Sequence, residues 1–214
     1  MDFIDKQISD YTENHTEPES ELLARLSRDT HVKILRPRML SGHLQGRVLS
    51  MLSHMIKPLN ILEIGTYTGY SALCLAEGMQ QNGRLITIDI NEELEEFVIP
   101  FFEEAGFGSQ INYKIGNAIN IIPTIDLNFD LVFIDADKIN YTHYYDLVFD
   151  KVNQGGYIII DNVLWSGKVI VTEGAKIDVD TQAILDFNKR VHLDPRVQNV
   201  LFPIRDGLMI LRKK

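Results

Sequence analysis

A short apolar run that ends in a glycine-rich turn, Asn60 to Tyr70 (NILEIGTYTGY), constrains this chain more than any other stretch. The run contains Glu63 among apolar residues, and the turn contains Gly65 and Gly69 before an apolar segment with helical spacing begins. A buried strand, a glycine-rich turn and a helix start form the unit that holds nucleotide-like ligands at the carboxyl end of a parallel sheet. The stretch therefore predicts an α/β fold with a ligand site at this turn.

Apolar runs and helical spacings alternate after this turn, which predicts a doubly wound α/β sheet. We expect strands over residues 60–64, 84–90, 111–115, 130–135, 157–161, 197–203 and 208–212. Arg205-Asp206-Gly207, between the last two runs, is a hairpin signal. The sheet is therefore expected to be mostly parallel and to close with an antiparallel C-terminal hairpin.

Helical spacing also covers the first 36 residues, where Pro18 separates two segments and Thr16 is a candidate cap. Arg36 to Met39 is expected to be extended, because the residue before a proline avoids the helical region. Ser41 is a candidate N-cap for a helix that reaches about residue 56. The first 36 residues are expected to cover a sheet edge, form a lid or pair with a second subunit.

Local signals also predict which helix faces are buried and where elements end. The helix after Ser41 has an apolar face that is expected to point inward. Its residues are Leu44, Val48, Leu49, Leu52 and Met55. Farther along, Pro100 is expected to bend or break a helix over 92–105, and residues 153–156 are expected to form a turn.

Composition favours a globular cytoplasmic protein. The 214 residues are 45% hydrophobic and 24% charged, which suits a single domain over residues 1–214. The net charge is −9, and basic residues cluster densely only at Arg212-Lys213-Lys214, which argues against nucleic acid as a partner. The apolar runs are too short to span a bilayer, and the acidic start does not resemble a secretory signal. The lone cysteine, Cys74, fits a reducing compartment.

The glycine-rich turn is predicted to hold a nucleoside. Gly65 permits a tight turn, and Asp89, at the end of the next predicted strand, can accept hydrogen bonds from ribose hydroxyls. Tyr67 stands where the dinucleotide fingerprint has its second glycine, so a pyrophosphate fits poorly. Glu63 needs a partner inside its strand, either backbone amides of the turn or a ligand ammonium. The alternative is a purely structural turn with an ordinary acid nearby.

Two later strand ends carry oxygen ligands for a hard cation. Asp135 ends one predicted strand, and Asp161 and Asn162 end its predicted neighbour. Two carboxylates and an amide oxygen suit Mg²⁺, Mn²⁺ or Ca²⁺ and make a poor zinc site. Lys138 is a candidate general base, because a lysine beside a cation loses proton affinity. The alternatives are acids that only cap loops and a solvated lysine, while Trp165 is either a wall for a planar substrate or a packing residue.

At these residues the sequence resembles the cation-dependent, S-adenosylmethionine-dependent O-methyltransferases, the group that contains the caffeoyl-CoA and catechol O-methyltransferases. The resemblance covers roughly residues 36–212 and rests on LEIGTYTGYS, ITIDIN, VFIDADKINY, DNVLW and RDGL. It implies the class I methyltransferase fold, with a seven-stranded sheet that ends in a reversed hairpin. It also implies a homodimer, since most members are dimers.

The resemblance implies a role for each matched residue. S-adenosylmethionine is expected to contact Met39, Ser41, Glu63, Gly65, Tyr67, Ser71, Asp89, Ala118 and Asp135. The divalent cation, Mg²⁺ or alternatively Mn²⁺ or Ca²⁺, is expected at Asp135, Asp161 and Asn162. The catalytic residues are expected to be Lys138 and Asp135, and the substrate is expected to contact Met39, Lys138 and Trp165.

The expected reaction is methyl transfer to one hydroxyl of a catechol-type acceptor. The hydroxyl loses its proton to Lys138 with the help of the cation, and the oxyanion attacks the sulfonium methyl in line. Orientation and electrostatics then supply most of the rate. An NAD-linked oxidoreductase and a non-catalytic cofactor-binding module are the alternatives. Free catechols, caffeoyl thioesters, flavonoids and other vicinal diols all stay open as acceptors.

Overall fold

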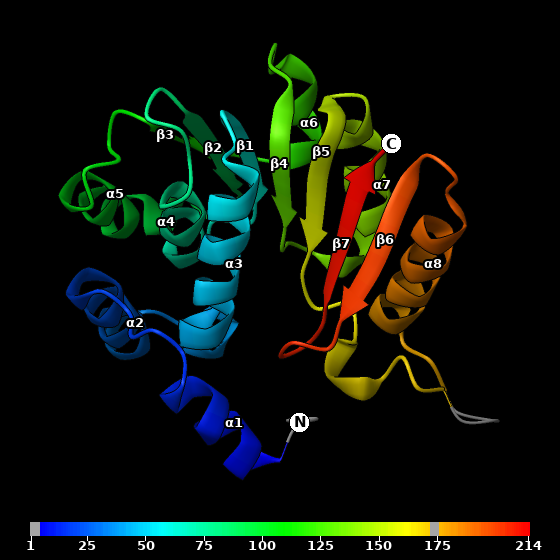
Figure 1. Cartoon of the computed structure of the whole chain (residues 1–214), viewed down its shortest axis with the longest axis horizontal. Helices are drawn as coiled ribbons and strands as arrows, with labels where there is room; N and C mark the ends of the chain where they lie inside the picture. Colours follow the sequence, from blue (N-terminus) through cyan, green and yellow to red (C-terminus); the bar gives the residue numbers. More distant parts are fainter. Residues whose placement is uncertain (1–4, 172–175) are drawn as a thin grey trace.

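The computed structural model describes residues 5–171 and 176–214, so the first four residues of the predicted N-terminal segment and part of the loop after residue 161 lie outside the description. Within these residues, one seven-stranded sheet has the order β3-β2-β1-β4-β5-β7-β6 (Figure 1). Its strands are β1 (Asn60–Ile64), β2 (Arg84–Asp89), β3 (Ile111–Ile115), β4 (Phe129–Ile134), β5 (Val152–Ile160), β6 (Val197–Phe202) and β7 (Leu208–Lys213). Pairing is parallel except around β7, which is antiparallel to β5 and β6. The predicted fold class is confirmed.

Helices cover both faces of this sheet (Figure 1). They are α1 (Lys6–Asn14), α2 (Glu21–Lys33), α3 (Gly42–Ile56), α4 (Tyr70–Ala76), α5 (Glu95–Glu104), α6 (Ala118–Ile121), α7 (Tyr141–Phe149) and α8 (Val179–Leu193). Short 3₁₀ turns are η1 (Pro37–Met39), η2 (Glu92–Leu94), η3 (Ile122–Thr124), η4 (Lys138–Asn140) and η5 (Trp165–Gly167). One buried cluster joins α6, α7 and α8 to the sheet, and a second joins α2, α3, α4 and α5. Burial on both faces explains why the central strands are continuous apolar runs.

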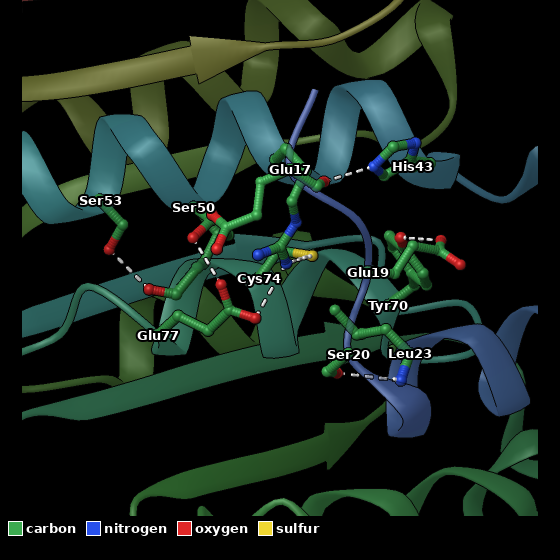
Figure 2. A network of polar contacts seen from close by, with 12 residues as sticks. Glu17, Glu19, Ser20, Leu23, His43, Ser50, Ser53, Tyr70, Cys74 and Glu77 are labelled. Atoms are coloured by element: carbon green, nitrogen blue, oxygen red, sulfur yellow. Dashed lines mark hydrogen bonds and ion pairs between the residues drawn. The ribbon is translucent and has the colours of Figure 1, made fainter. Parts of the chain in front are cut away.

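The N-terminal helices form as predicted, but their boundaries differ. Ser20 rather than Thr16 caps α2, since its side chain accepts from the backbone N–H of Leu23 at 3.3 Å (Figure 2). Arg36 to Met39 is not extended, because Arg36 is left-handed with φ of 59° and Pro37 opens η1. The ring of Pro37 clashes with a preceding residue in the right-handed helical region, and Arg36 avoids this clash by adopting the left-handed conformation instead of an extended one. Ser41 precedes α3 as predicted, yet its side chain makes no capping bond.

The strand β5 begins at Val152, so the predicted turn over 153–156 is wrong. Val152 pairs with Phe129 and Tyr157 pairs with Leu131, which leaves extra residues on β5 between the two pairs. Gly155 adopts a φ of 80° within this bulge, a conformation that glycine reaches without steric cost. Pro100 lies inside α5 without ending it.

The predicted inner face of α3 is confirmed in part. Leu49 is fully buried and Val48 and Leu52 pack against the core, but Met55 is 74% exposed and the polar residues Gln45 and Ser53 are buried instead. The helix approaches α4 closely, since a Cβ added to Gly46 would lie 2.5 Å from the Tyr70 ring. Small and polar side chains therefore join Leu49 on the inner face of α3.

Polar bonds fix α3 against α4 (Figure 2). Arg47 forms an ion pair with Glu77 at 2.9 Å, and the Ser50 hydroxyl donates to the same carboxylate. The Ser53 hydroxyl donates to the carbonyl oxygen of Leu75 at 2.6 Å. These bonds supplement the packing between the two helices, so α3 has a defined position over the sheet.

The turn after β1 meets the end of β4 at very short range. Gly65 has a φ of 100°, and a Cβ added to it would lie 1.9 Å from the carbonyl oxygen of Asp135. The backbone N–H of Asp135 donates to Ile64 at 2.9 Å, which continues the ladder between the two strands.

Among residues 5–171 and 176–214, no helix has the length and apolarity to cross a membrane.

The substitution Gly65→Ala is expected to destabilise the fold far more than Gly106→Ala. Both glycines have positive φ, but a Cβ at Gly106 meets nothing within 4 Å. Gly106→Ala should therefore lower the free energy of unfolding by about 1–2 kcal/mol, the cost of a left-handed alanine. Gly65→Ala adds a collision with backbone, so its loss should exceed that by at least about 2 kcal/mol in urea unfolding. Equal losses would contradict the close contact.

Candidate functional site

Two neighbouring strands end in the predicted acidic residues. Asp135 follows β4 and Asp161 follows β5, and the backbone N–H of Asp161 donates to Ile134 at 3.0 Å. The ends of parallel strands lie at the same edge of a sheet, so this pairing brings the two carboxylates together. The sequence-based prediction that these strands are neighbours is confirmed.

Lys138 lies at the centre of this cluster. Its Nζ donates to Asp135 Oδ1 at 3.1 Å, to Asn162 Oδ1 at 2.7 Å and to the Tyr141 hydroxyl at 2.5 Å. The side chain is only 9% exposed. The alternative of a solvated lysine is therefore wrong. Of the four predicted residues, Asp135 and Asn162 both contact the Nζ atom of Lys138.

Asp161 is the most buried member of the cluster. Its Oδ1 accepts from the backbone N–H of Asn162 at 2.7 Å, and its Oδ2 accepts from Gln45 Nε2 at 2.6 Å. Burial and the nearby Asp135 charge raise the pKa of Asp161 to about 7. Tyr141 donates to the Asp161 carbonyl at 2.8 Å, and burial holds the pKa of the Tyr141 hydroxyl well above its ordinary value.

The donor set fits a hard divalent cation. Asp135 Oδ1 and Asn162 Oδ1 converge on Lys138 Nζ, and the Asp161 carboxylate lies close enough to feel the charges of Asp135 and Lys138. A site whose oxygens converge on an ammonium favours positive charge, and Mg²⁺ and Ca²⁺ prefer such oxygens. Across the described parts of the chain, no group of three or more His, Cys, Asp and Glu side chains is placed to hold a metal.

The loop after β5 holds Trp165 beside Lys138. Lys138 Nζ lies 5.9 Å from the centre of the Trp165 ring. Asn162, Trp165 and Ser166 have φ of 58°, 48° and 51°, so this loop carries unfavourable backbone conformations. Asp206 stabilises it from the β6–β7 turn, because its Oδ1 accepts from Ser166 N at 2.5 Å and its carbonyl accepts from Leu164 N at 2.8 Å.

Glu63 lies fully buried beneath the glycine-rich turn. One carboxylate oxygen accepts from Ser71 Oγ at 2.6 Å, and the other accepts from Thr87 Oγ1 at 2.5 Å. Two hydroxyls therefore take the place of the backbone amides that were one of the two predicted partners, while the other, a ligand ammonium, stays a prediction. Burial raises the pKa of Glu63 to about 8, although both hydrogen bonds oppose the rise.

Asp89 lies beside the turn as predicted. Its Oδ2 accepts from the backbone N–H of Tyr67 at 2.7 Å, and Tyr67 has a φ of 48°. The Tyr67 hydroxyl donates to the carbonyls of Leu35 and Arg36 at 3.1 and 3.2 Å, which ties the turn to the segment before η1. Ala118 begins α6 and is buried.

The segment just before α3 is hydrogen-bonded to the turn of the C-terminal hairpin. Arg205 Nη1 donates to the Leu40 carbonyl at 3.2 Å. Next to Leu40, Met39 is 53% exposed and Ser41 is buried. The structure thus connects Met39 and Ser41 to the hairpin, while their contacts with ligands stay predictions.

Three residues of the site were not identified from the sequence. Thr87 lies opposite Glu63 in the β1–β2 register, which the two predicted strands indicate once they are aligned. Tyr141 follows Lys138 by three residues at the start of a predicted helix, a spacing that brings the two side chains together. Gln45 gave no signal, because it resembles a residue on the polar, solvent-facing side of an amphipathic helix.

The substitution Glu63→Gln is expected to weaken the pH dependence of stability. Folding raises the pKa of Glu63 from an ordinary 4.5 to about 8, so the folded chain keeps a proton that the unfolded chain releases. The stability that this group contributes is complete below about pH 4.5 and is lost as the pH rises towards 8. The Tm of the cofactor-free protein should therefore fall less across this window in E63Q than in the wild type. Glu96→Gln, on an exposed residue of α5, is the control, and equal slopes for all three proteins would contradict the expectation.

Comparisons with known sequences point to one family. A sequence model described as O-methyltransferase matches residues 12–214. Caffeoyl-CoA O-methyltransferase 1 of Arabidopsis thaliana is 34% identical over 179 residues, which cover 79% of this chain and 69% of that protein. Caffeoyl-CoA O-methyltransferase of Medicago sativa is 35% identical over 179 residues, which cover 79% of this chain and 72% of that protein.

Solved structures agree with these sequence matches. The SAH-bound Podospora anserina methyltransferase PaMTH1 has a TM-score of 0.87 at 28% identity, over 97% of this chain and 94% of that one. The O-methyltransferase TomG from Streptomyces achromogenes, in complex with SAM, has a TM-score of 0.85 at 26% identity, over 97% and 96% of the two chains. The chain therefore belongs to the O-methyltransferase family, as an S-adenosylmethionine-dependent enzyme.

Proposed function

We propose that this enzyme methylates one hydroxyl of a catechol-type acceptor and depends on a divalent cation, with Mg²⁺ as the first candidate. The observation that carries the proposal is the convergence of Asp135, Asn162 and Lys138, with Asp161 buried next to them. Similarity to plant caffeoyl-CoA O-methyltransferases also supports the acceptor class, because a caffeoyl group carries two adjacent ring hydroxyls.

The residues of the cluster have separate tasks in this proposal. Asp135, Asp161 and Asn162 hold the cation, which supplies the positive charge that acidifies an acceptor hydroxyl. Lys138 Nζ would take the hydroxyl proton in its neutral form, which has a free lone pair and donates at most two of its three hydrogen bonds to Asp135, Asn162 and Tyr141. Trp165, next to Lys138, gives a flat wall that orients an aromatic ring.

The glycine-rich turn serves the cofactor in this proposal. Asp89 is placed to accept from the ribose, and Gly65 lets the ligand approach the backbone. Tyr67 lies in the turn and Ser71 follows it, and the Ser71 hydroxyl donates to Glu63 in the strand before the turn. Further contacts are proposed for Met39, Ser41 and Ala118. Most of the rate then comes from holding the acceptor oxygen in line with the methyl group.

Methyl transfer from S-adenosylmethionine to 3,4-dihydroxybenzoate or caffeate, with Mg²⁺ and with excess EDTA, tests this function. Turnover that requires Mg²⁺ and disappears with EDTA supports both the reaction and the cation. A monohydroxy analogue, 4-hydroxybenzoate, should not be methylated, because it lacks the second oxygen. Turnover of the diol that persists in EDTA would rule out the role of the cation.

The substitution Asp135→Ala is expected to reduce kcat/KM by at least about 100-fold, because it removes a ligand of the cation and a partner of Lys138. Cofactor binding should stay measurable by calorimetry, since the glycine-rich turn keeps its own contacts. Asp146→Ala removes an exposed carboxylate on α7 and serves as the control. The role of Asp135 would be refuted by a variant that keeps wild-type turnover.

We also propose a cytoplasmic homodimer. The exposed apolar side chains Met51 and Met55 of α3, at 61% and 74% exposure, offer a surface for a second copy. Sedimentation velocity should give a mass of about twice the 24.5 kDa of one chain. A sedimenting mass equal to one chain at micromolar concentration would argue for a monomer.

A further inference from the structure

Gln45 is a buried polar side chain that the proposed reaction does not explain. It lies near the start of α3 and is 2% exposed, and its Nε2 donates to Asp161 Oδ2 at 2.6 Å. Burial of an amide is costly unless the group is hydrogen-bonded, so this bond makes Gln45 compatible with the interior. The bond joins α3 directly to the carboxyl end of β5.

The bond from Gln45 completes the restraint of Asp161. The other carboxylate oxygen accepts from the backbone N–H of Asn162 at 2.7 Å, and the Asp161 carbonyl accepts from Tyr141 at 2.8 Å. Each carboxylate oxygen has two lone pairs, so both oxygens of Asp161 keep one for a cation. The two bonds to the carboxylate oxygens therefore fix the orientation of the side chain without exhausting its ligand capacity, and the bond from Tyr141 holds the backbone beneath it.

Gln45 is itself placed by a rigid support. The helix α3 is held on α4 by the Arg47–Glu77 ion pair and by the bond from Ser53 to Leu75, and Gly46 contacts Tyr70 without room for a Cβ (Figure 2). A ligand geometry is only as well defined as the groups that hold the ligands. The position of the Gln45 amide is thus determined by helix packing rather than by a mobile loop.

We propose that Gln45 is a positioning residue for the cation site, whose amide holds Asp161 in the orientation in which it binds the cation. The proposal rests on the cation-dependent function given above. An amide donor suits this position because it is neutral. A carboxylate there would add a third negative charge beside Asp135 and Asp161.

The test measures Mn²⁺ binding to the full chain by electron paramagnetic resonance of the free ion, without any acceptor. Gln45→Met keeps the length of the side chain and removes the donor, so the Kd for Mn²⁺ should rise about 10–100-fold. Gln45→Asn keeps an amide but shortens it by one methylene, and a smaller rise is expected. Ser53→Ala, which removes a buried bond of α3 away from the site, is the matched control and should bind Mn²⁺ like the wild type.

Steady-state kinetics supply a second readout that a general loss of stability would not move. In Q45M the concentration of Mg²⁺ needed for half-maximal turnover should rise, while KM for S-adenosylmethionine stays within about two-fold. Wild-type Mn²⁺ affinity in both Gln45 variants would overturn the positioning role alone. A wild-type chain that binds no Mn²⁺ would overturn the proposed function, and the role of Gln45 with it.

Discussion

The contact between Gly65 and the carbonyl oxygen of Asp135 is the constraint on which the site depends. Any side chain at residue 65 would lie within 1.9 Å of that oxygen. Because the contact is between backbones, the glycine-rich turn and the Asp135 loop have one fixed relative position. Under the proposed function, this arrangement would hold a methyl donor at the turn next to an acceptor at the loop, as an in-line transfer requires. The parallel register of β1 and β4 sets this arrangement, and no mobile segment is required for it.

The region around the glycine-rich turn and the Asp135 loop is also rich in acidic side chains. Burial raises the pKa of Glu63 and of Asp161, and the nearby Asp135 charge adds to both shifts. Within the described residues, the positive group that contacts this set is Lys138. An acidic region with little positive charge of its own favours cationic ligands. The sulfonium of S-adenosylmethionine and the proposed divalent cation are both positively charged, so the same acidic region would favour both.

The positions of the strands along the chain and the acids at their ends were predictable because they depend on local signals. Apolar runs fix β1 to β5, and an acid at the end of a parallel strand can only lie at the carboxyl edge, as Asp135 and Asp161 do. The partners of these acids were less predictable. Thr87 requires the register between two strands, and Gln45 requires the packing of a helix more than one hundred residues away from Asp161. Bulges such as the one at Gly155 depend on register as well, so the start of β5 was misplaced.

The sequence-based prediction for α3 is wrong at Met55, and it misses Gln45 and Ser53, because the helix approaches α4 very closely. An amphipathic pattern predicts that the apolar side faces the core, but Gly46 has no room for a Cβ beside Tyr70, so small and polar side chains join Leu49 on the inner face. Gln45 and Ser53 point inward, where they donate to Asp161 and to the carbonyl oxygen of Leu75. Met51 and Met55 stay exposed, and in the proposed homodimer a second copy would bury them. Apolar spacing alone therefore does not decide which side chains of α3 are buried, because helix packing and polar partners decide it as well.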